Sequence, residues 1–248
     1  MPPPVVLAHR GARRVAPENT LAAFAAARDE GADGVELDVR RSADGELVIH
    51  HDAAVPDFGV LAEHAWADIH AALPQVPTLA EALDACAGML VNVEIKNLPG
   101  DPDHDPDERA AAAVVGLLAD RGQRDQVVVS SFSVATVDAV HALDRGVETA
   151  LLMLVGFDVL AGARVAADRG HRAVHPDVRG LVDGVVEPLV EQAQDLVLAV
   201  RAWTVNDPEA VRRLARAGVD GIITDVPAVA LAALAELGGE GRVRAPRV

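Results

Sequence analysis

The 248-residue chain has few cysteines, aromatic residues and lysines, and it has no long apolar run. Its single cysteine, Cys86, excludes an intramolecular disulfide and fits a reducing compartment. No run reaches the roughly 18 apolar residues that a transmembrane helix needs. The opening Met1-Pro2-Pro3-Pro4 lacks the charged start and apolar stretch of a secretory signal. These absences predict a cytoplasmic protein without an integral membrane segment.

The charge balance argues against a further set of functions. The formal net charge is −16, so bulk electrostatics favour neither nucleic acid nor an anionic membrane as a partner. An anionic substrate would have to be attracted by a local cluster of cations. Of the 22 basic residues, 21 are arginine and only Lys96 is lysine. A lone lysine in an apolar strand indicates a point charge that a guanidinium cannot replace, with chance as the alternative.

Half of the residues are apolar, and β-branched runs alternate with alanine- and leucine-rich stretches. The pattern predicts strands near 5–9, 34–40, 90–96, 126–131, 148–154, 173–175, 196–202 and 221–223. It predicts helices near 19–30, 78–87, 107–121, 133–145, 158–169, 181–194, 207–217 and 227–237. Eight such alternations favour one α/β domain over residues 1–237, a (β/α)₈ TIM barrel. The alternative, an open doubly wound sheet, would want a glycine-rich phosphate turn after the first strand, and none is present.

Three segments fall outside this alternation. Residues 41–77 contain a short strand-like run at 46–49 and otherwise no clear period, which predicts an elaborated loop after the second strand. The acidic run 101–108 lacks the glycine and final glutamate of an EF-hand loop, so we expect a solvated loop whose last acids favour the next helix. The tail 238–248 is predicted to fray.

Polar residues lie where the predicted strands end, and a barrel enzyme carries its reacting groups there. His9 closes the first strand. Glu36 and Asp38 are two residues apart in the second strand, so they share a face, as do Glu94 and Lys96 in the third. Three carboxylates at one barrel mouth would repel each other unless a cation lay between them. All the candidate ligands are oxygen donors, which predicts one hard divalent ion, Mg²⁺ or Ca²⁺.

Short motifs follow one another along nearly the whole chain: His9-Arg10-Gly11, Pro17-Glu18-Asn19-Thr20, Glu36-x-Asp38, His51-Asp52, Glu94-Ile95-Lys96, Ser131-Phe132, His175-Pro176, Trp203-Thr204-Val205-Asn206 and Gly221-Ile222-Ile223-Thr224-Asp225-x-Pro227. In this order they resemble the glycerophosphodiester phosphodiesterase family. The resemblance implies a TIM barrel with one divalent ion. The segment 53–75 is shorter than the insertion that members of the family often carry there, which leaves the substrate less defined than the reaction.

The resemblance also implies a role for each matching residue. Three carboxylates would bind the metal, two cations would hold the phosphate, and two histidines would be general base and general acid, in an order that the sequence leaves open. The attacking oxygen would be the glycerol hydroxyl beside the phosphate, giving a cyclic intermediate that water then opens. Trp203 would form a wall of the substrate pocket, with core packing as its alternative. By this resemblance the metal ligands are Glu36, Asp38 and Glu94, the phosphate ligands are Arg10 and Lys96, and the acid–base pair is His9 and His51.

Several neighbouring residues have two interpretations. Asn19 and Thr20 have the chemistry of a helix N-cap, and Glu18 and Asn19 are also placed to brace the site. Asp225 is predicted to cap the last helix. Of the doublet His50-His51, we expect His51 to enter the site, because strand alternation turns His50 to the opposite side.

The leading prediction is therefore a metal-dependent hydrolase that converts glycerophosphodiesters to sn-glycerol 3-phosphate and an alcohol. One alternative keeps the site and changes the substrate to a lysophospholipid-type diester, which would need an apolar groove; the scarcity of aromatic residues argues against it. Another is a catalytically idle barrel that binds a phosphorylated ligand. The predicted partner is a small-molecule phosphodiester, and the oligomeric state is not predicted.

Overall fold

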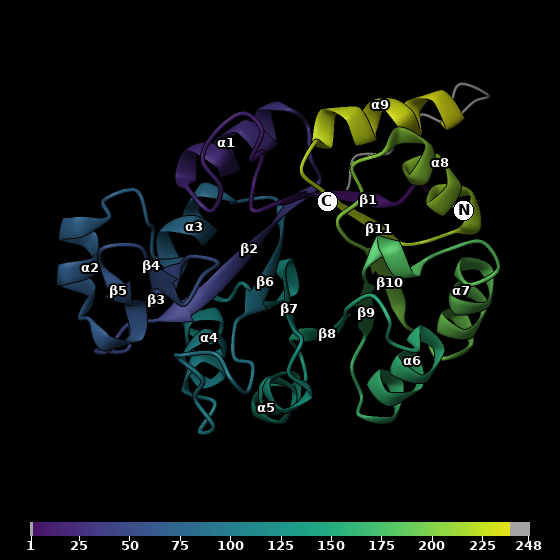
Figure 1. Cartoon of the computed structure of the whole chain (residues 1–248). Helices are drawn as coiled ribbons and strands as arrows, with labels where there is room; N and C mark the ends of the chain where they lie inside the picture. Colours follow the sequence, from purple (N-terminus) through teal and green to yellow (C-terminus); the bar gives the residue numbers. More distant parts are fainter. Residues whose placement is uncertain (1, 239–248) are drawn as a thin grey trace.

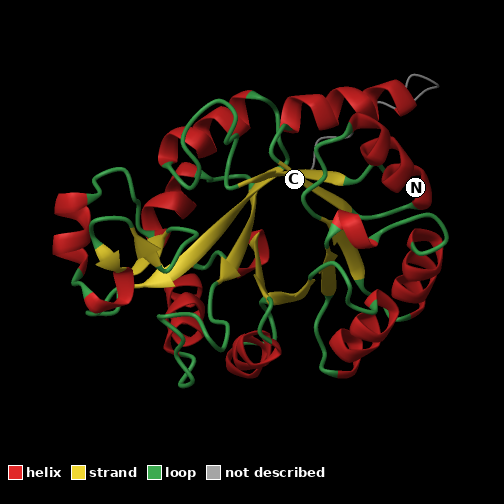
Figure 2. Ribbon diagram, in the orientation of Figure 1, coloured by secondary structure: helices red, strands yellow, loops and turns green. Residues whose placement is uncertain are grey.

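In the computed structural model, which describes residues 2–238, parallel strands form a closed barrel surrounded by helices (Figures 1 and 2). The barrel strands are β1 (Val5–His9), β2 (Gly34–Arg41), β6 (Leu90–Ile95), β7 (Val127–Ser131), β8 (Glu148–Met153), β9 (Ala173–Pro176), β10 (Ala199–Ala202) and β11 (Gly221–Thr224). β1 pairs in parallel with both β2 and β11, which closes the barrel. The predicted TIM barrel is confirmed.

A helix separates each barrel strand from the next and packs on the outside of the barrel (Figure 2). The helices are α1 (Leu21–Asp29), α3 (Leu79–Ala85), α4 (Arg109–Arg121), α5 (Val134–Leu143), α6 (Val159–Asp168), α7 (Val186–Asp195), α8 (Pro208–Ala217) and α9 (Pro227–Gly238), with 3₁₀ turns η2 (Arg124–Gln126) and η3 (Val178–Gly180). Among residues 2–238 no helix is long and apolar enough to cross a membrane. Gly238 ends α9, and the rest of the predicted tail lies outside the described residues.

Alternation along the strands separates the reacting groups from the apolar core. In β2, Val35, Leu37 and Val39 are fully buried among the apolar side chains of α1 and α3. Glu36 and Asp38 alternate with them and therefore point into the barrel. The strand is consequently apolar on the side that packs against the helices and acidic on the side that faces the barrel mouth.

The segment between β2 and α3 is more ordered than the predicted loop. It contains β3 (Leu47–Ile49), which pairs antiparallel with β2, the small hairpin β4 (Ala54–Val55) and β5 (Gly59–Val60), the turn η1 (Leu61–Glu63) and the helix α2 (Trp66–Ala72). A separate apolar cluster of Val48, Leu61, Ile69 and Val76 holds it together. α2 has seven residues, about two turns, which is too short to give a clear period in the sequence.

Candidate active site

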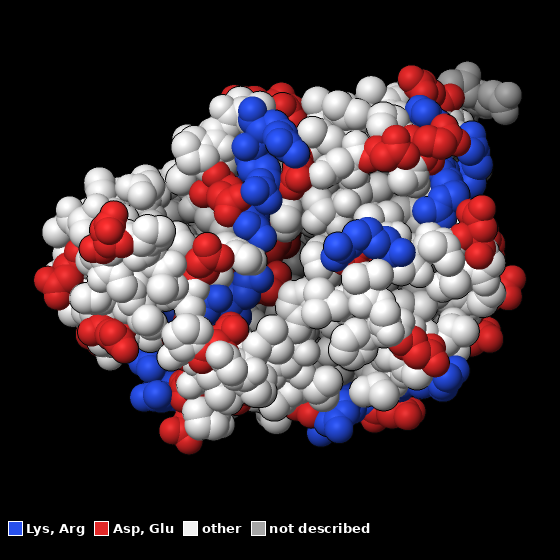
Figure 3. Space-filling model, viewed as in Figure 1, with Lys and Arg blue, Asp and Glu red and all other residues white. Residues whose placement is uncertain are grey.

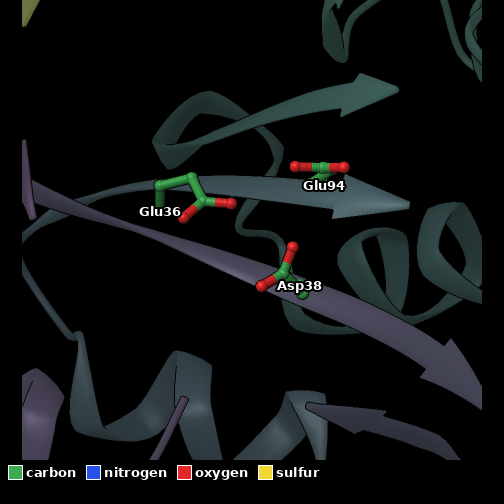
Figure 4. A group of neighbouring side chains, drawn as sticks. All are labelled: Glu36, Asp38 and Glu94. Carbon is green, nitrogen blue, oxygen red and sulfur yellow. The ribbon is translucent and has the colours of Figure 1, made fainter. Parts of the chain in front are cut away.

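Three carboxylates meet at the barrel mouth because of strand register. Asp38 of β2 is the direct cross-strand neighbour of Glu94 of β6, and Glu36 lies two residues before Asp38. One carboxylate oxygen from each lies within 4.8 Å of the other two (Figure 4). All three residues are buried, with Asp38 only 1% exposed. The structure therefore brings together the three residues predicted to bind a metal.

Two cations lie against these carboxylates. The Lys96 ammonium is 2.9 Å from Asp38 Oδ1 and 2.5 Å from Glu94 Oε1, and Arg10 Nε is 3.2 Å from Asp38 Oδ2. Burial alone would lower the pKa of Lys96, but Glu94 and Asp38 outweigh burial and raise it. Burial would raise the pKa of Asp38, but Lys96 and Arg10 hold it well below its usual range. Lys96, Arg10 and Asp38 are therefore all charged at neutral pH.

For the other two carboxylates, Glu36 and Glu94, the nearby cations do not outweigh the effect of burial on the pKa. Burial, together with the neighbouring charges of Asp38 and Glu94, raises the pKa of Glu36 well above its usual range. Burial raises the pKa of Glu94 to about 7, against the lowering effect of Lys96. Glu36 Oε1 is buried without a hydrogen-bond partner among the described residues. An unpartnered buried acceptor within a cluster of oxygen donors fits a hard divalent cation.

His9 is held in place by a hydrogen bond across the closure of the barrel. It lies at the end of β1, and its Nδ1 is 2.7 Å from Asp225 Oδ1 at the end of β11. The other oxygen of Asp225 accepts a hydrogen bond from Asn206 Nδ2 at 2.8 Å. Burial would raise the pKa of Asp225, but the bonds to His9 and Asn206 lower it to about 2. Asp225 therefore fixes the His9 ring, a different role from the predicted helix cap, and leaves Nε2 facing Glu36 at 4.0 Å.

His51 follows β3 in a bend, and its Nδ1 is 2.7 Å from Asp52 Oδ1. Burial and the charges of Lys96 and Arg10 lower the pKa of its imidazole, and Asp38 opposes them. His51 lines the same pocket as His9, whereas the His50 ring bonds to the carbonyl of Asp52. The structure thus places His51, not His50, in the pocket, as expected from alternation.

The loop between β1 and α1 both caps the helix and braces the site. The Thr20 hydroxyl accepts from the backbone N–H of Ala23, so Thr20 is the N-cap of α1. Asn19 instead donates from Nδ2 to Asp38 Oδ2 at 2.8 Å, and Glu18 accepts from Arg10 at 2.8 Å. Thr20 therefore caps the helix, whereas Glu18 and Asn19 brace the site.

Gly11 explains why the loop after His9 can turn so sharply. It has φ +78°, a conformation that glycine adopts without strain. A Cβ at this position would lie 2.7 Å from the backbone carbon of Ala23. The tight approach of the loop to α1 is what aims the backbone N–H of Arg10 at Glu36 Oε2, at 3.0 Å.

The opposite side of the pocket is apolar. Trp203 packs edge-on against Phe132 with ring centroids 5.5 Å apart, and its Nε1 donates to the carbonyl of His175 at 2.7 Å. Trp203 thus lines the pocket, whereas the fully buried His175 contributes its backbone carbonyl only. Including its open mouth, the pocket holds about 570 Å³ and is lined on this side by Phe132, Leu152, Leu154, Trp203 and Ile223.

Charge is distributed unevenly over the face of the barrel that holds the pocket. Figure 3 shows lysine and arginine side chains running in a stripe from the edge near α1 toward the middle of this face, next to a broad uncharged area. The loop after β1 contributes Arg10, Arg13 and Arg14, and Arg13 and Arg14 lie 3.7 and 3.8 Å from the Asp225 carboxylate. A local cluster of cations therefore exists in spite of the net charge of −16.

The model of the Glycerophosphoryl diester phosphodiesterase family matches residues 9–229 of this chain. The chain belongs to this family. A glycerophosphodiester phosphodiesterase of Caldanaerobacter subterraneus is 30% identical, with 90% of this chain and 94% of that protein covered. The protein YqiK of Bacillus subtilis is 31% identical over 92% of this chain and 98% of its own length.

Solved structures agree with this assignment. The glycerophosphodiester phosphodiesterase of Thermotoga maritima superposes with a TM-score of 0.77 at 26% identity, covering 96% of this chain and 99% of that one. A phosphodiesterase of Oleispira antarctica, solved in complex with the product sn-glycerol 3-phosphate, gives a TM-score of 0.81 at 26% identity, covering 94% and 97%. The family, the fold and the class of enzyme predicted from the sequence are confirmed.

Sequence reasoning missed the residues that orient the two histidines. The role of Asn206 was not predicted, Asp52 was noted only as part of a motif, and Asp225 was predicted to cap a helix instead. The available signal was the position of both residues. Asp225 follows β11 directly, Asn206 lies in the loop after β10, and the two strands pair beside β1. A polar residue at the end of each neighbouring strand is a candidate for the same site.

Proposed function

We propose that this protein hydrolyses glycerophosphodiesters to sn-glycerol 3-phosphate and an alcohol, with one divalent cation, Mg²⁺ or Ca²⁺, and with His9 and His51 as its acid–base pair. Glu36, Asp38 and Glu94 would hold the cation. When bound, the ion would supply positive charge that stabilises the extra negative charge of the phosphoryl transition state.

Charge balance supports the cation and the phosphate together. A bound cation would keep all three carboxylates ionised, and against the charges of Arg10 and Lys96 they would leave one negative charge in excess at the barrel mouth. A divalent cation turns this excess into a single positive charge, which matches the single negative charge of a phosphodiester. Arg10 and Lys96 would then hold the phosphate oxygens and lower the barrier to attack on phosphorus.

The two histidines are suited to move one proton each. Each ring is bonded through Nδ1 to an aspartate, His9 to Asp225 and His51 to Asp52, which leaves Nε2 of each ring for the substrate. One histidine would take the proton of the attacking glycerol hydroxyl, and the other would give a proton to the leaving alcohol. Water would then open the cyclic intermediate, with the two roles reversed.

The observation that carries the proposal is that two histidine–aspartate pairs face the same cluster of carboxylates and cations. A panel of glycerophosphodiesters assayed with Mg²⁺, Ca²⁺, Mn²⁺ or excess EDTA tests it. We expect sn-glycerol 3-phosphate to be released only with a divalent ion. Undiminished turnover in EDTA after exhaustive dialysis would refute the metal assignment. Release of glycerol and the phosphorylated alcohol would show that the bond on the glycerol side of the phosphate is cleaved, and would refute the proposed products.

The apolar side of the pocket favours a second substrate class, lysophospholipid-type diesters. Leu154 lines the pocket and is 43% exposed, and Phe157, in the same loop after β8, is 66% exposed. An acyl chain would find apolar surface continuous with the site there, in spite of the few aromatic residues. Comparing kcat/KM for glycerophosphocholine and a lysophosphatidylcholine separates the two classes. A kcat/KM for the lysophosphatidylcholine more than about 100-fold below that for glycerophosphocholine would exclude the lipid as the substrate.

A further inference from the structure

The acidic run after β6 is only in part the solvated loop that the sequence predicts, because Pro102, Pro106 and Asp107 are exposed but two aspartate side chains are buried. Asp105 is buried, and its carboxylate accepts bonds from the backbone N–H of Asp107 and from both the backbone N–H and Nε of Arg109, the first residue of α4. Asp105 therefore favours the start of α4, whereas Glu108, one of the last acids predicted to do so, is its N-cap residue without a side-chain cap bond. The side chain of Asp103 is also turned inward and is only 4% exposed.

Asp103 is turned inward because it pairs with a buried arginine of β2. Arg40 NH1 donates to both carboxylate oxygens of Asp103, at 2.7 and 2.6 Å, and the Arg40 side chain is 5% exposed. Asp101 adds a weaker contact, with Oδ2 3.7 Å from Arg40 NH2. The pair joins the loop before α4 to the strand that carries Glu36 and Asp38 (Figure 1).

The same guanidinium holds the backbone of a predicted acid–base residue. Arg40 Nε donates to the carbonyl of His51 at 2.8 Å. One arginine therefore bonds at once to the loop after β6 and to the loop after β3. The guanidinium carries five N–H donors in one rigid plane, so one nitrogen can bind Asp103 while Nε binds the His51 carbonyl in a fixed relative geometry.

His51 needs such an anchor more than His9 does. His9 belongs to a barrel strand, and its side chain is 13% exposed. His51 lies in a bend outside the strands, and its side chain is 36% exposed. Packing therefore restricts His51 less than His9. The precision with which an acid–base group on a loop is placed depends on the hydrogen bonds that hold its backbone.

We propose that Arg40, held by Asp103, is a positioning residue that fixes the backbone of His51 and thereby places its imidazole at the phosphate. This inference rests on the proposed function, because it assumes that His51 transfers a proton. It assigns a catalytic consequence to a buried ion pair that would otherwise count as structural.

The test compares Arg40→Met with wild type in the wild-type and His51→Ala backgrounds, using glycerophosphocholine with a saturating divalent ion. In the wild-type background we expect kcat to fall about tenfold while KM changes less than about twofold, because the ring is misplaced and the phosphate contacts remain. In the His51→Ala background we expect Arg40→Met to lower kcat by less than about twofold, since a residue that acts through His51 has nothing left to position.

Two further variants keep the result interpretable. Arg40→Met leaves Asp103 as a buried unpaired charge, so Arg40→Met/Asp103→Leu removes both charges and still removes the bond to His51; we expect the same loss of kcat. Arg179→Met is a control at an exposed arginine. It removes an arginine–aspartate pair on the same face, with Asp177, that bonds to neither histidine, and we expect kcat within about twofold of wild type.

A readout without turnover separates this inference from the proposed function. In the metal-free protein, at one fixed pH, the imidazole signals of His51 in a ¹H–¹³C NMR spectrum should shift or broaden in Arg40→Met, while those of His9 stay in place. Unchanged His51 signals, an unchanged kcat in both Arg40 variants, or equal kcat losses in the two backgrounds would overturn the role of Arg40. A wild-type protein that cleaves no glycerophosphodiester would refute the proposed function instead.

Discussion

The carboxylate cluster predicts an unusual pH dependence for the protein without its metal. Burial raises the pKa of Glu94 in the folded state to about 7, from an ordinary value of 4.5. Between these two pH values the folded protein retains a proton that the unfolded chain has released. The free energy of unfolding of the metal-free protein should therefore fall as the pH rises from 4.5 to about 7.

The size of the effect follows from the two pKa values. The difference between 4.5 and about 7 corresponds to about 3 kcal/mol for Glu94 alone. For a chain of this length that is a decrease in Tm of roughly 5–10 °C. Glu36 acts in the same direction, because its pKa is also raised. A bound divalent ion replaces the proton, so saturating Mg²⁺ or Ca²⁺ should raise Tm most at the upper end of this range.

Calorimetry at pH 5, 6, 7 and 8, with EDTA or with the metal, measures this dependence. Glu94→Gln cannot ionise, so we expect it to lose the part of the decrease in Tm between pH 5 and 7 that Glu94 causes, and most of the stabilisation by metal. The exposed carboxylate of Glu191 in α7 provides the control, and Glu191→Gln should behave like wild type. Parallel Tm curves for wild type and Glu94→Gln in EDTA would refute a buried acid with a raised pKa.

Three further predictions concern the reacting groups. His9→Ala and His51→Ala should each lower kcat by about 100-fold or more at unchanged Tm, and near-wild-type rates in steady-state assays would remove the acid–base pair. Lys96→Arg should lower kcat/KM at least about tenfold, because a guanidinium does not fit where the ammonium contacts both Asp38 and Glu94; full activity would show that any cation serves. Asp225→Asn should lower kcat about 100-fold in a pH–rate profile, because an amide does not fix the His9 tautomer, whereas a change in KM alone would contradict this role.

The sequence alone determined the barrel and most of the cluster. Alternation of side chains in a strand is a local property, so the shared face of Glu36 and Asp38 and the choice of His51 over His50 could be predicted from neighbouring residues. Between β2 and α3 only the strand-like run that became β3 was predicted, because the two-residue strands and a seven-residue helix carry too little periodicity.

Only the tertiary structure decided which distant residues meet. Nothing local indicates that Asp225 bonds to His9, 216 positions earlier in the chain, because that contact exists only when β11 pairs with β1 and closes the barrel. The link from Asp103 through Arg40 to His51 likewise depends on the loop before α4 folding back over β2. Sequence periodicity sets which face of a strand a residue occupies, whereas its partners across the barrel depend on closure and register, which are properties of the whole sheet.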